Sequence, residues 1–318
     1  MDHLPSAAKT AFLFPGQGSQ ATGMGLTLSR TYPAARHVFE QADELLGFSI
    51  SQLCWEGPET ELNDTINTQP ALLVHSCAAL RVFQNLFPNF QPAFVAGHSM
   101  GELSALVAAG ALPFGDALHL VRRRGELMKR AGEVSPGGMA AILGLDIPTL
   151  DRICAEASRP GEIVQVANDN CPGQVVISGA SPALERALEL AQQAGARKSK
   201  ALAVSIAAHS PLMRHAQSDF NQAVEAAPFA DPNIPLVGNV TALPLASAED
   251  VRADLQAQLT SRVRWTESIQ NMLARGVSTF VELGSGTVLT GLLKRIDPDA
   301  ARINLGTPEE FEKFAALA

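Results

Sequence analysis

The chain has 318 residues, of which 46% are hydrophobic and 18% charged, and its formal net charge is −8. This length and composition are typical of one large α/β core, or of a main domain with a smaller insert, and they exclude a disordered chain. The negative charge argues against nucleic acid as the main partner, and no apolar run approaches the roughly 20 residues that span a bilayer.

The spacing of the cysteines and the first residues of the sequence indicate the cellular compartment of the protein. Cys54, Cys77, Cys154 and Cys171 lie far apart and form no C-x-x-C pair. We therefore expect free thiols in a reducing compartment, and neither a disulfide framework nor a zinc site. The first residues lack the basic and then apolar pattern of a secretory signal. These features predict a cytoplasmic protein that holds no metal and has no contact with a membrane.

The first part of the chain reads as alternating strands and helices. A short apolar run at residues 11–14, ended by Pro15-Gly16, predicts a buried strand followed by a turn. A second strand is expected at residues 93–96, running into Gly97. Helical patterns cover residues 33–46, 71–86, 102–109 and 115–131. The last of these is expected to end at Gly132, where a C-cap glycine belongs.

The pattern changes after the boundary at residues 135–138. The expected order is then strand, helix, strand, strand, helix, strand, at residues 139–143, 148–157, 163–167, 174–178, 182–194 and 201–205. This order is the split arrangement of a ferredoxin-like unit, which suggests an inserted subdomain. An α/β alternation resumes afterwards, with helices at 211–226, 248–259 and 266–274 and strands at 235–240 and 279–283. We predict an α/β fold with a main domain of residues 1–135 and 207–318 and an insert of residues 136–206.

One motif carries a nucleophile. Gly97-His98-Ser99-Met100-Gly101 stands between a predicted strand and a predicted helix, which is the context that gives G-x-S-x-G its meaning. The tight turn lifts the serine hydroxyl off the backbone, and the unpaired N–H groups of the new helix point to where an oxyanion would form. The alternative interpretation is that the two glycines only permit a tight strand-to-helix turn and that Ser99 has no catalytic role. We favour Ser99 as the nucleophile of an acyl-transfer enzyme.

A serine nucleophile needs a base, and His209 is the best placed of the seven histidines. His209 follows a predicted strand and precedes Ser210-Pro211, a typical helix start. His98 would have to double back to reach Ser99, so we interpret it as structural. Other histidines fall in helical patterns or at the chain start. No aspartate is clearly poised as a third member, so a Ser–His pair is the simpler hypothesis.

Two further segments allow two interpretations each. The loop Pro15-Gly16-Gln17-Gly18-Ser19-Gln20-Ala21 matches G-x-G-x-x-A after a strand. However, no acidic residue stands at the end of a second strand about twenty positions later, where a dinucleotide-binding site would need it for the ribose. We therefore favour a loop whose backbone N–H groups bind an oxyanion. Arg122-Arg123-Arg124 spreads over about 200° of a helix, so one guanidinium is expected to face inward. Such a group can grip a carboxylate or serve a structural ion pair. We expect Arg122 and Arg123 to lie on a solvated face.

A series of motifs, in order and with suitable spacing, resembles the malonyl-CoA:acyl carrier protein transacylases from about residue 11 to residue 305. The segments are residues 12–20, Thr68-Gln69-Pro70-Ala71, residues 97–102, Arg124-Gly125, Asn168 with Pro172-Gly173-Gln174, His209-Ser210 and Glu282-Leu283-Gly284. The resemblance implies an α/β-hydrolase-like main domain with a ferredoxin-like insert. It implies malonyl-CoA as the donor, an acyl carrier protein as the partner, and no cofactor.

The resemblance also implies roles for individual residues. Ser99 attacks the thioester, and His209 takes its proton. The backbone N–H groups of Gln17 and Met100 hold the oxyanion, and Arg124 binds the malonyl carboxylate. The main-chain carbonyl of Gln258 orients the imidazole, and Asn168 is a candidate for the cavity entrance.

Some features leave alternatives open. Many malonyl-selective relatives carry an aromatic residue or a serine where Ala208 precedes His209, so Ala208 leaves more room for the acyl group. An esterase or thioesterase could use the same elbow, and a noncatalytic nucleotide-binding protein could use the loop at Gly16. The pathway supplied, whether fatty acid, polyketide or malonate metabolism, is not fixed by the sequence. Arg197, Lys198 and Lys200 are basic candidates for docking an acidic carrier, and nothing demands more than a monomer.

Overall fold

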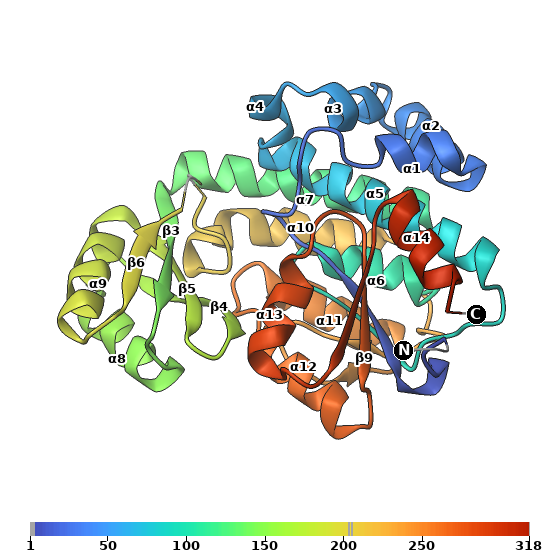
Figure 1. The fold of residues 1–318 in the computed structure, drawn as a ribbon. Coiled ribbons are helices and arrows are strands. Elements are labelled where there is room, and N and C mark those ends of the chain that lie inside the picture. The colour runs from blue at the N-terminus through green and yellow to red at the C-terminus, as the bar shows by residue number, and fades with distance from the viewer. Residues whose placement is uncertain (1–3, 203, 205, 318) are drawn as a thin grey trace.

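Continuous apolar runs form the centre of a six-stranded sheet in the computed structural model, which describes residues 4–202, 204 and 206–317 (Figure 1). The strand order is β10-β9-β1-β2-β7-β8, in which β8 alone runs antiparallel to its neighbour. The strands are β1 (Thr10–Phe14), β2 (Phe94–Gly97), β7 (Leu236–Val237), β8 (Pro244–Leu245), β9 (Thr279–Leu283) and β10 (Ala301–Leu305).

Both faces of this sheet are buried, because helices cover each of them. Phe12, Phe14 and Val281 point into one core, whereas Leu13 and Phe280 point into a second core on the other face. The helices are α1 (Leu26–Thr31), α2 (Pro33–Leu46), α3 (Ile50–Glu56), α4 (Glu59–Leu62), α5 (Thr65–Leu86), α6 (Gly101–Ala108), α7 (Phe114–Val134), α10 (Arg214–Ala226), α11 (Ala248–Gln258), α12 (Trp265–Ala274), α13 (Val288–Ile296) and α14 (Pro308–Ala315). Short 3-10 turns lie at Ala7–Lys9 and Pro211–Met213.

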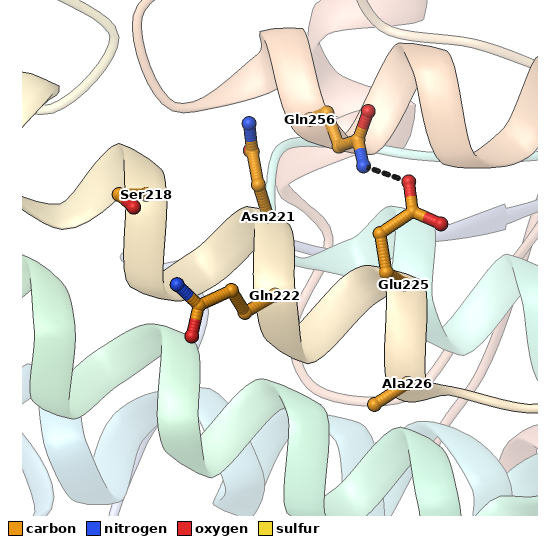
Figure 2. A pocket seen from close by; sticks show the side chains of 6 residues that line it. All are labelled: Ser218, Asn221, Gln222, Glu225, Ala226 and Gln256. Carbon is orange, nitrogen blue, oxygen red and sulfur yellow. Dashed lines mark hydrogen bonds between the residues drawn. The ribbon is translucent and has the colours of Figure 1, made fainter.

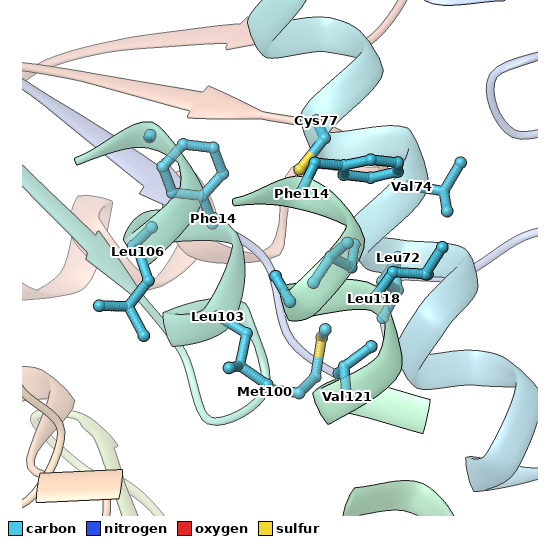
Figure 3. Close-up of a cluster of buried hydrophobic side chains, with 14 of the residues drawn as sticks. Phe14, Leu72, Val74, Cys77, Met100, Leu103, Leu106, Phe114, Leu118 and Val121 are labelled. Atoms are coloured by element: carbon cyan, nitrogen blue, oxygen red, sulfur yellow. The ribbon is translucent and has the colours of Figure 1, made fainter. Parts of the chain in front are cut away.

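The larger core surrounds the helix that follows β2. Figure 3 shows Met100 and Leu103 at the start of α6, packed in a cluster with side chains of β1, α5 and α7. Met100 and Leu103 are each 1% exposed. The start of α6 is therefore fixed by close packing, and so is the turn that precedes it.

The predicted ferredoxin-like unit is confirmed as a second, four-stranded antiparallel sheet at one end of the molecule (Figure 1). Its elements follow the expected order: β3 (Gly137–Leu143), α8 (Ile147–Ala157), β4 (Val164–Cys171), β5 (Gln174–Ala180), α9 (Ser181–Gln193) and β6 (Lys198–Ala201). The strand order β4-β5-β3-β6 and a separate hydrophobic core set this unit apart from the larger sheet. The α/β fold class expected from the sequence is thus confirmed.

Several predicted boundaries differ. The strand expected at 201–205 is β6, which ends at Ala201; Leu202 and Val204 are not in a strand, and positions 203 and 205 lie outside the described residues. The strand expected at 235–240 shrinks to Leu236–Val237. The helix expected to end at Gly132 continues to Val134, so Gly132 is not its C-cap.

The helix expected at 71–86 begins earlier, at Thr65, and contains Pro70. Proline cannot donate the helical hydrogen bond to the carbonyl of residue i−4, here Ile66. Arg122 Nη1 donates to that carbonyl instead, at 3.1 Å. The expectation that Arg122 lies on a solvated face is therefore wrong. Its guanidinium is half-buried and satisfies an acceptor that the proline leaves free. Arg123 is exposed, as expected.

The parallel strands deliver several loops to one edge of the larger sheet. β1 leads into the loop at Gln17, β2 into Ser99, and β7 into the turn at Asn239. Carboxyl ends of parallel strands meet at the same edge, and this edge is where α/β sheets bind ligands.

Candidate active site

Ser99 lies in a sharp turn between β2 and α6, with a backbone φ of 52°. The turn is possible because Gly97 and Gly101 lack side chains. A Cβ on Gly97 would lie 2.0 Å from the carbonyl carbon of Gly101, and one on Gly101 would lie 2.3 Å from the Phe14 carbonyl oxygen. The two glycines therefore serve backbone contacts that no other residue permits, and the serine side chain is presented above the end of the strand.

His209 meets this serine from the loop before Pro211–Met213. Its Nε2 lies 2.7 Å from Ser99 Oγ, and its Nδ1 lies 3.0 Å from the Gln258 carbonyl oxygen. A carbonyl only accepts hydrogen bonds, so Nδ1 carries the proton and Nε2 is left as an acceptor for the serine hydroxyl. Burial, followed by the charge of Arg124, lowers the pKa of His209 to about 3. The imidazole is therefore neutral at physiological pH.

A polar frame that the sequence did not indicate holds both groups in place. The Ser99 N–H donates to Asn239 Oδ1 at 2.8 Å, and Asn239 Nδ2 donates to the Gly97 carbonyl at 2.7 Å. Gln165 Nε2 donates to the His209 carbonyl at 2.7 Å. His98 points away from the nucleophile, with its Nε2 2.9 Å from Asn170 Oδ1, which agrees with a structural role.

Arg124 is the inward-facing member of its arginine triplet and is 1% exposed. Its Nη2 donates to Ser99 Oγ at 3.2 Å and to Gln258 Oε1 at 2.8 Å, and its Nη1 donates to Gln69 Oε1 at 2.8 Å. Among the described residues, no carboxylate forms an ion pair with this guanidinium, and its Nε has no partner. Burial lowers the pKa of Arg124 to about 10, so the group remains a cation. A buried cation without a counter-ion is costly and favours an anionic ligand.

The two backbone amides that the resemblance implies, those of Gln17 and Met100, lie on loops that touch one another. A Cβ on Gly16 would lie 2.5 Å from the His98 carbonyl oxygen, so the Gln17 loop runs against the serine turn. Within the described part of the chain, neither the Gln17 N–H nor the Met100 N–H has a backbone or side-chain acceptor. Both amides are therefore available to a ligand oxygen.

A cavity of about 290 Å³ opens above these groups. Ser99, His209 and Arg124 line it together with apolar side chains such as Met128 and Val176. Asn168 lines the cavity and is 5% exposed. The small sheet supplies part of the wall, and the full lining is Gln17, Thr65, His98, Ser99, Met100, Arg124, Met128, Met139, Ala141, Asn168, Asn170, Gln174, Val176, Leu202, Val204, Ile206, Ala208 and His209.

Other hollows lack this chemistry. A shallow groove of about 680 Å³ between α10 and α11 is lined by Ser218, Asn221, Gln222, Glu225, Ala226 and Gln256 (Figure 2). Its Gln256 Nε2 donates to Glu225 Oε1 at 2.6 Å, and no imidazole lines it. Across residues 4–202, 204 and 206–317, no three His, Cys, Asp or Glu side chains are grouped so that they could hold a metal ion. No helix in the described part of the chain has the length and apolarity that a membrane span requires.

Comparisons with known proteins agree with this geometry. The model of the acyl transferase domain family matches residues 11–299. The malonyl CoA-acyl carrier protein transacylase of Bacillus subtilis is 45% identical over 305 residues, which are 96% of each chain. That of Haemophilus influenzae is 43% identical, over 95% of this chain and 97% of the relative.

Solved structures give the same result. An acyl carrier protein S-malonyltransferase from Vibrio cholerae superposes with a TM-score of 0.92 at 42% identity, covering 96% of this chain and 99% of the other. A type II PKS malonyl-transacylase in complex with its acyl carrier protein superposes with a TM-score of 0.92 at 41% identity, with the same coverage.

Proposed function

The chain belongs to the malonyl-CoA:acyl carrier protein transacylase family, and from this premise we propose that Ser99 carries the malonyl group as an ester between coenzyme A and the carrier protein. The protein is an enzyme, an acyl carrier protein S-malonyltransferase. One observation carries the assignment of residues: the hydroxyl of Ser99 contacts both a neutral imidazole at 2.7 Å and a buried, unpaired guanidinium at 3.2 Å.

In the first half-reaction, Ser99 Oγ attacks the thioester carbonyl carbon while its proton passes to His209 Nε2. The carbonyl oxygen becomes an oxyanion, for which the Gln17 and Met100 N–H groups are the proposed donors. The intermediate collapses by breaking the bond to sulfur. The CoA thiolate leaves and takes the proton from His209, and the malonyl ester remains on Ser99.

In the second half-reaction, the phosphopantetheine thiol of the carrier protein gives its proton to His209 Nε2 and attacks the ester carbonyl. Collapse breaks the bond to Ser99 Oγ, which recovers the proton. A groove of about 560 Å³ shares Gln17, Thr65, Val204 and Ile206 with the catalytic cavity and offers room for the pantetheine arm. Arg197, Lys198 and Lys200, around the exposed edge strand β6, remain candidates for docking an acidic carrier.

Arg124 is proposed to bind the free malonyl carboxylate. A carboxylate in the cavity would supply the counter-ion that the guanidinium lacks, through two parallel hydrogen bonds. A neutral acyl group would leave the buried cation unpaired, which disfavours acetyl and longer neutral chains. The Gln258 carbonyl, which accepts from His209 Nδ1, is proposed to take the place of an aspartate in orienting the base. Asn168 is proposed as a residue of the cavity entrance.

Further proposals concern the whole molecule. The separate hydrophobic core of the small sheet supports a division into residues 1–135 with 207–318 and residues 136–206. The four buried, free cysteines support a cytoplasmic location. We propose a monomer that needs no cofactor, since side chains and backbone amides can supply every step above. The carrier belongs to fatty acid or polyketide synthesis, and one of the solved structures is a polyketide pair.

Intact mass spectrometry tests the proposal. Incubation with malonyl-CoA should add one malonyl group to the protein, and the Ser99→Ala variant should stay unmodified. Ser104→Ala, at a buried serine of α6 outside the cavity lining, is the matched control and should be acylated normally. Added holo carrier protein should then remove the group from the enzyme. An equally abundant adduct on Ser99→Ala would refute the nucleophile. Continued release of CoA over many turnovers without an acceptor would favour a thioesterase.

A further inference from the structure

Two acidic side chains lie buried behind the site, where the mechanism above does not use them. Glu102, in the first turn of α6, is fully buried, and Asp254 on α11 is 4% exposed. Glu102 Oε2 accepts a hydrogen bond from Gln258 Nε2 at 2.7 Å, but Oε1 has no donor among the described residues. Asp254 accepts from the backbone N–H groups of Asn239, Val240 and Thr241 at 3.2 to 3.4 Å.

We propose that Glu102 and Asp254 share one proton, which resides on Glu102, and that the neutral Glu102 is a positioning residue that holds the Gln258 amide against Arg124. The inference deepens the function proposed above and rests on it for the role of Arg124. Glu102 acts only through Gln258, since it has no hydrogen bond to Ser99 Oγ or His209.

The location of the proton follows from the hydrogen-bond partners. The two carboxyl groups lie within hydrogen-bonding reach of each other. Two ionised carboxylates would offer each other only acceptors in a buried site. Asp254 has three N–H donors that stabilise its ionised form. Glu102 accepts one side-chain hydrogen bond among the described residues, from the Gln258 amide, and burial together with the charge of Asp254 raises its pKa well above the usual range. A proton on Glu102 Oε1 donates to Asp254 and satisfies the oxygen that otherwise lacks a donor.

The charges around Glu102 support the same state. The charged groups that face it are Asp254 from α11 and Arg124 from α7. With a neutral Glu102, one anion and one cation remain in this buried region. An ionised Glu102 would add a second anion behind Gln258, and it would compete with the acyl carboxylate for the field of Arg124.

Gln258 transmits the position of Glu102 to the reacting groups. Its Nε2 donates to Glu102 Oε2 and, at 3.1 Å, to the Ser99 carbonyl, so its Oε1 is directed to Arg124 Nη2 at 2.8 Å. Arginine has only donors, and a flipped amide would place an NH₂ group against the guanidinium. The backbone carbonyl of the same residue accepts from His209 Nδ1. Glu102 thereby fixes the one residue that contacts both the base and the carboxylate-binding cation.

Two substitutions test whether Glu102 is neutral or ionised. Glu102→Gln reproduces the neutral pattern, because its carbonyl can accept from Gln258 while its NH₂ donates to Asp254. Glu102→Met fills the space but removes both hydrogen bonds. We would measure the rate of Ser99 acylation by malonyl-CoA and by acetyl-CoA from pH 6 to 9, with quenched samples analysed by intact mass. Thermal unfolding would report whether each variant is folded.

Glu102→Gln should keep malonyl acylation within about threefold of the wild type, with the same pH profile, whereas Glu102→Met should lower the malonyl-to-acetyl ratio about tenfold. A purely structural role would change stability and leave this ratio intact, which would overturn the proposal. The proposal would also be overturned if Glu102→Gln lost as much malonyl acylation as Glu102→Met. The same holds if the pH profile of the wild type had an inflection that the profile of Glu102→Gln lacks. If Glu102→Met does not fold, Glu102→Gln and its pH profile decide alone. Failure of the proposed function would look different, because the wild type itself would not be acylated.

Discussion

Ser99 and His209, which meet through a 2.7 Å hydrogen bond, both have left-handed backbones, with φ of 52° and 57°. A non-glycine residue in this region costs roughly 1–2 kcal/mol, and the surrounding structure has to compensate for it. At Ser99 the compensation comes from the packed start of α6 and from Asn239, which bonds both the Ser99 N–H and the Gly97 carbonyl. The proposed nucleophile and base are thus held in a backbone geometry that stability alone disfavours.

This strain gives a first prediction. Glycine at position 99 relieves the left-handed backbone, whereas alanine keeps it, so Ser99→Gly should be more stable than Ser99→Ala by about 1 kcal/mol. Urea unfolding of the two inactive variants measures the difference. If Ser99→Ala were the more stable of the two, the serine turn would not be strained.

Arg124 should select the acyl group. Replacement by Met keeps much of the volume but removes the cation, so malonyl acylation should fall about 100-fold or more while acetyl acylation changes less than about tenfold. Arg123→Met, an exposed position on the same helix, is the control and should leave both rates unchanged. Equal losses for the two acyl groups would show that the guanidinium is only structural.

Ala208 lines the cavity next to the base. The small side chain leaves space beside the acyl group, so we expect the wild type to accept methylmalonyl-CoA at a measurable rate. Ala208→Phe should lower the methylmalonyl-to-malonyl ratio about tenfold, because the ring occupies the space for the extra methyl group. A competition of malonyl-, methylmalonyl- and acetyl-CoA with a carrier protein measures the ratio. An unchanged ratio would place selectivity elsewhere in the cavity.

Arg122 should matter for stability, because it compensates for Pro70 inside α5. Without its guanidinium the Ile66 carbonyl loses its donor, so Arg122→Met should cost about 1–2 kcal/mol of unfolding free energy. Arg123→Met removes only exposed ion pairs with Glu126 and Asp219 and should cost about 0.5 kcal/mol or less. Similar urea midpoints for the two variants would contradict this account.

Acid should destabilise the fold through buried histidines. Burial lowers the pKa of His75 to about 4, below the ordinary value of 6.5. The unfolded chain therefore binds a proton that the folded chain excludes, so stability is complete above pH 6.5 and is lost as the pH falls toward 4. His75→Gln should reduce the slope of unfolding free energy against pH in this window by up to about 1.4 kcal/mol per pH unit. An unchanged slope in His75→Gln would contradict this account.

Much of the architecture was predictable because it depends on local pattern. Apolar runs ended by glycine locate β1 and β2, and the change of rhythm after residue 135 indicates the ferredoxin-like unit. The elements that were not predicted correctly also have local causes. α3 and α4 have only 7 and 4 residues, too short for a clear helical period, and β7 has only two. The start of α5 was not predicted because Pro70 lies inside the helix. The hydrogen bond that Pro70 cannot donate is replaced by one from Arg122.

The candidate site was predictable only where a motif signals it. Ser99 has such a motif and His209 follows from its loop position, and the structure brings their side chains together. Asn239 and the Gln258 side chain act through contacts between residues 134 to 142 positions apart, and nothing in their own neighbourhood distinguishes them. Gln69 lies in a segment that resembles the family, but its contact with Arg124, 55 positions away, is not signalled there. The role of Glu102 depends on its burial beside Asp254, which no sequence period encodes.

The walls of the catalytic cavity come from both sheets. Ser99 follows β2 of the larger sheet and Arg124 lies on α7, while Met139, Ala141 and Val176 reach in from the smaller sheet. Substitutions at these three positions can therefore reshape the space for the acyl group without removing a hydrogen bond of Ser99 or His209. Gln165 on β4 has to stay, because its side chain donates to the His209 carbonyl.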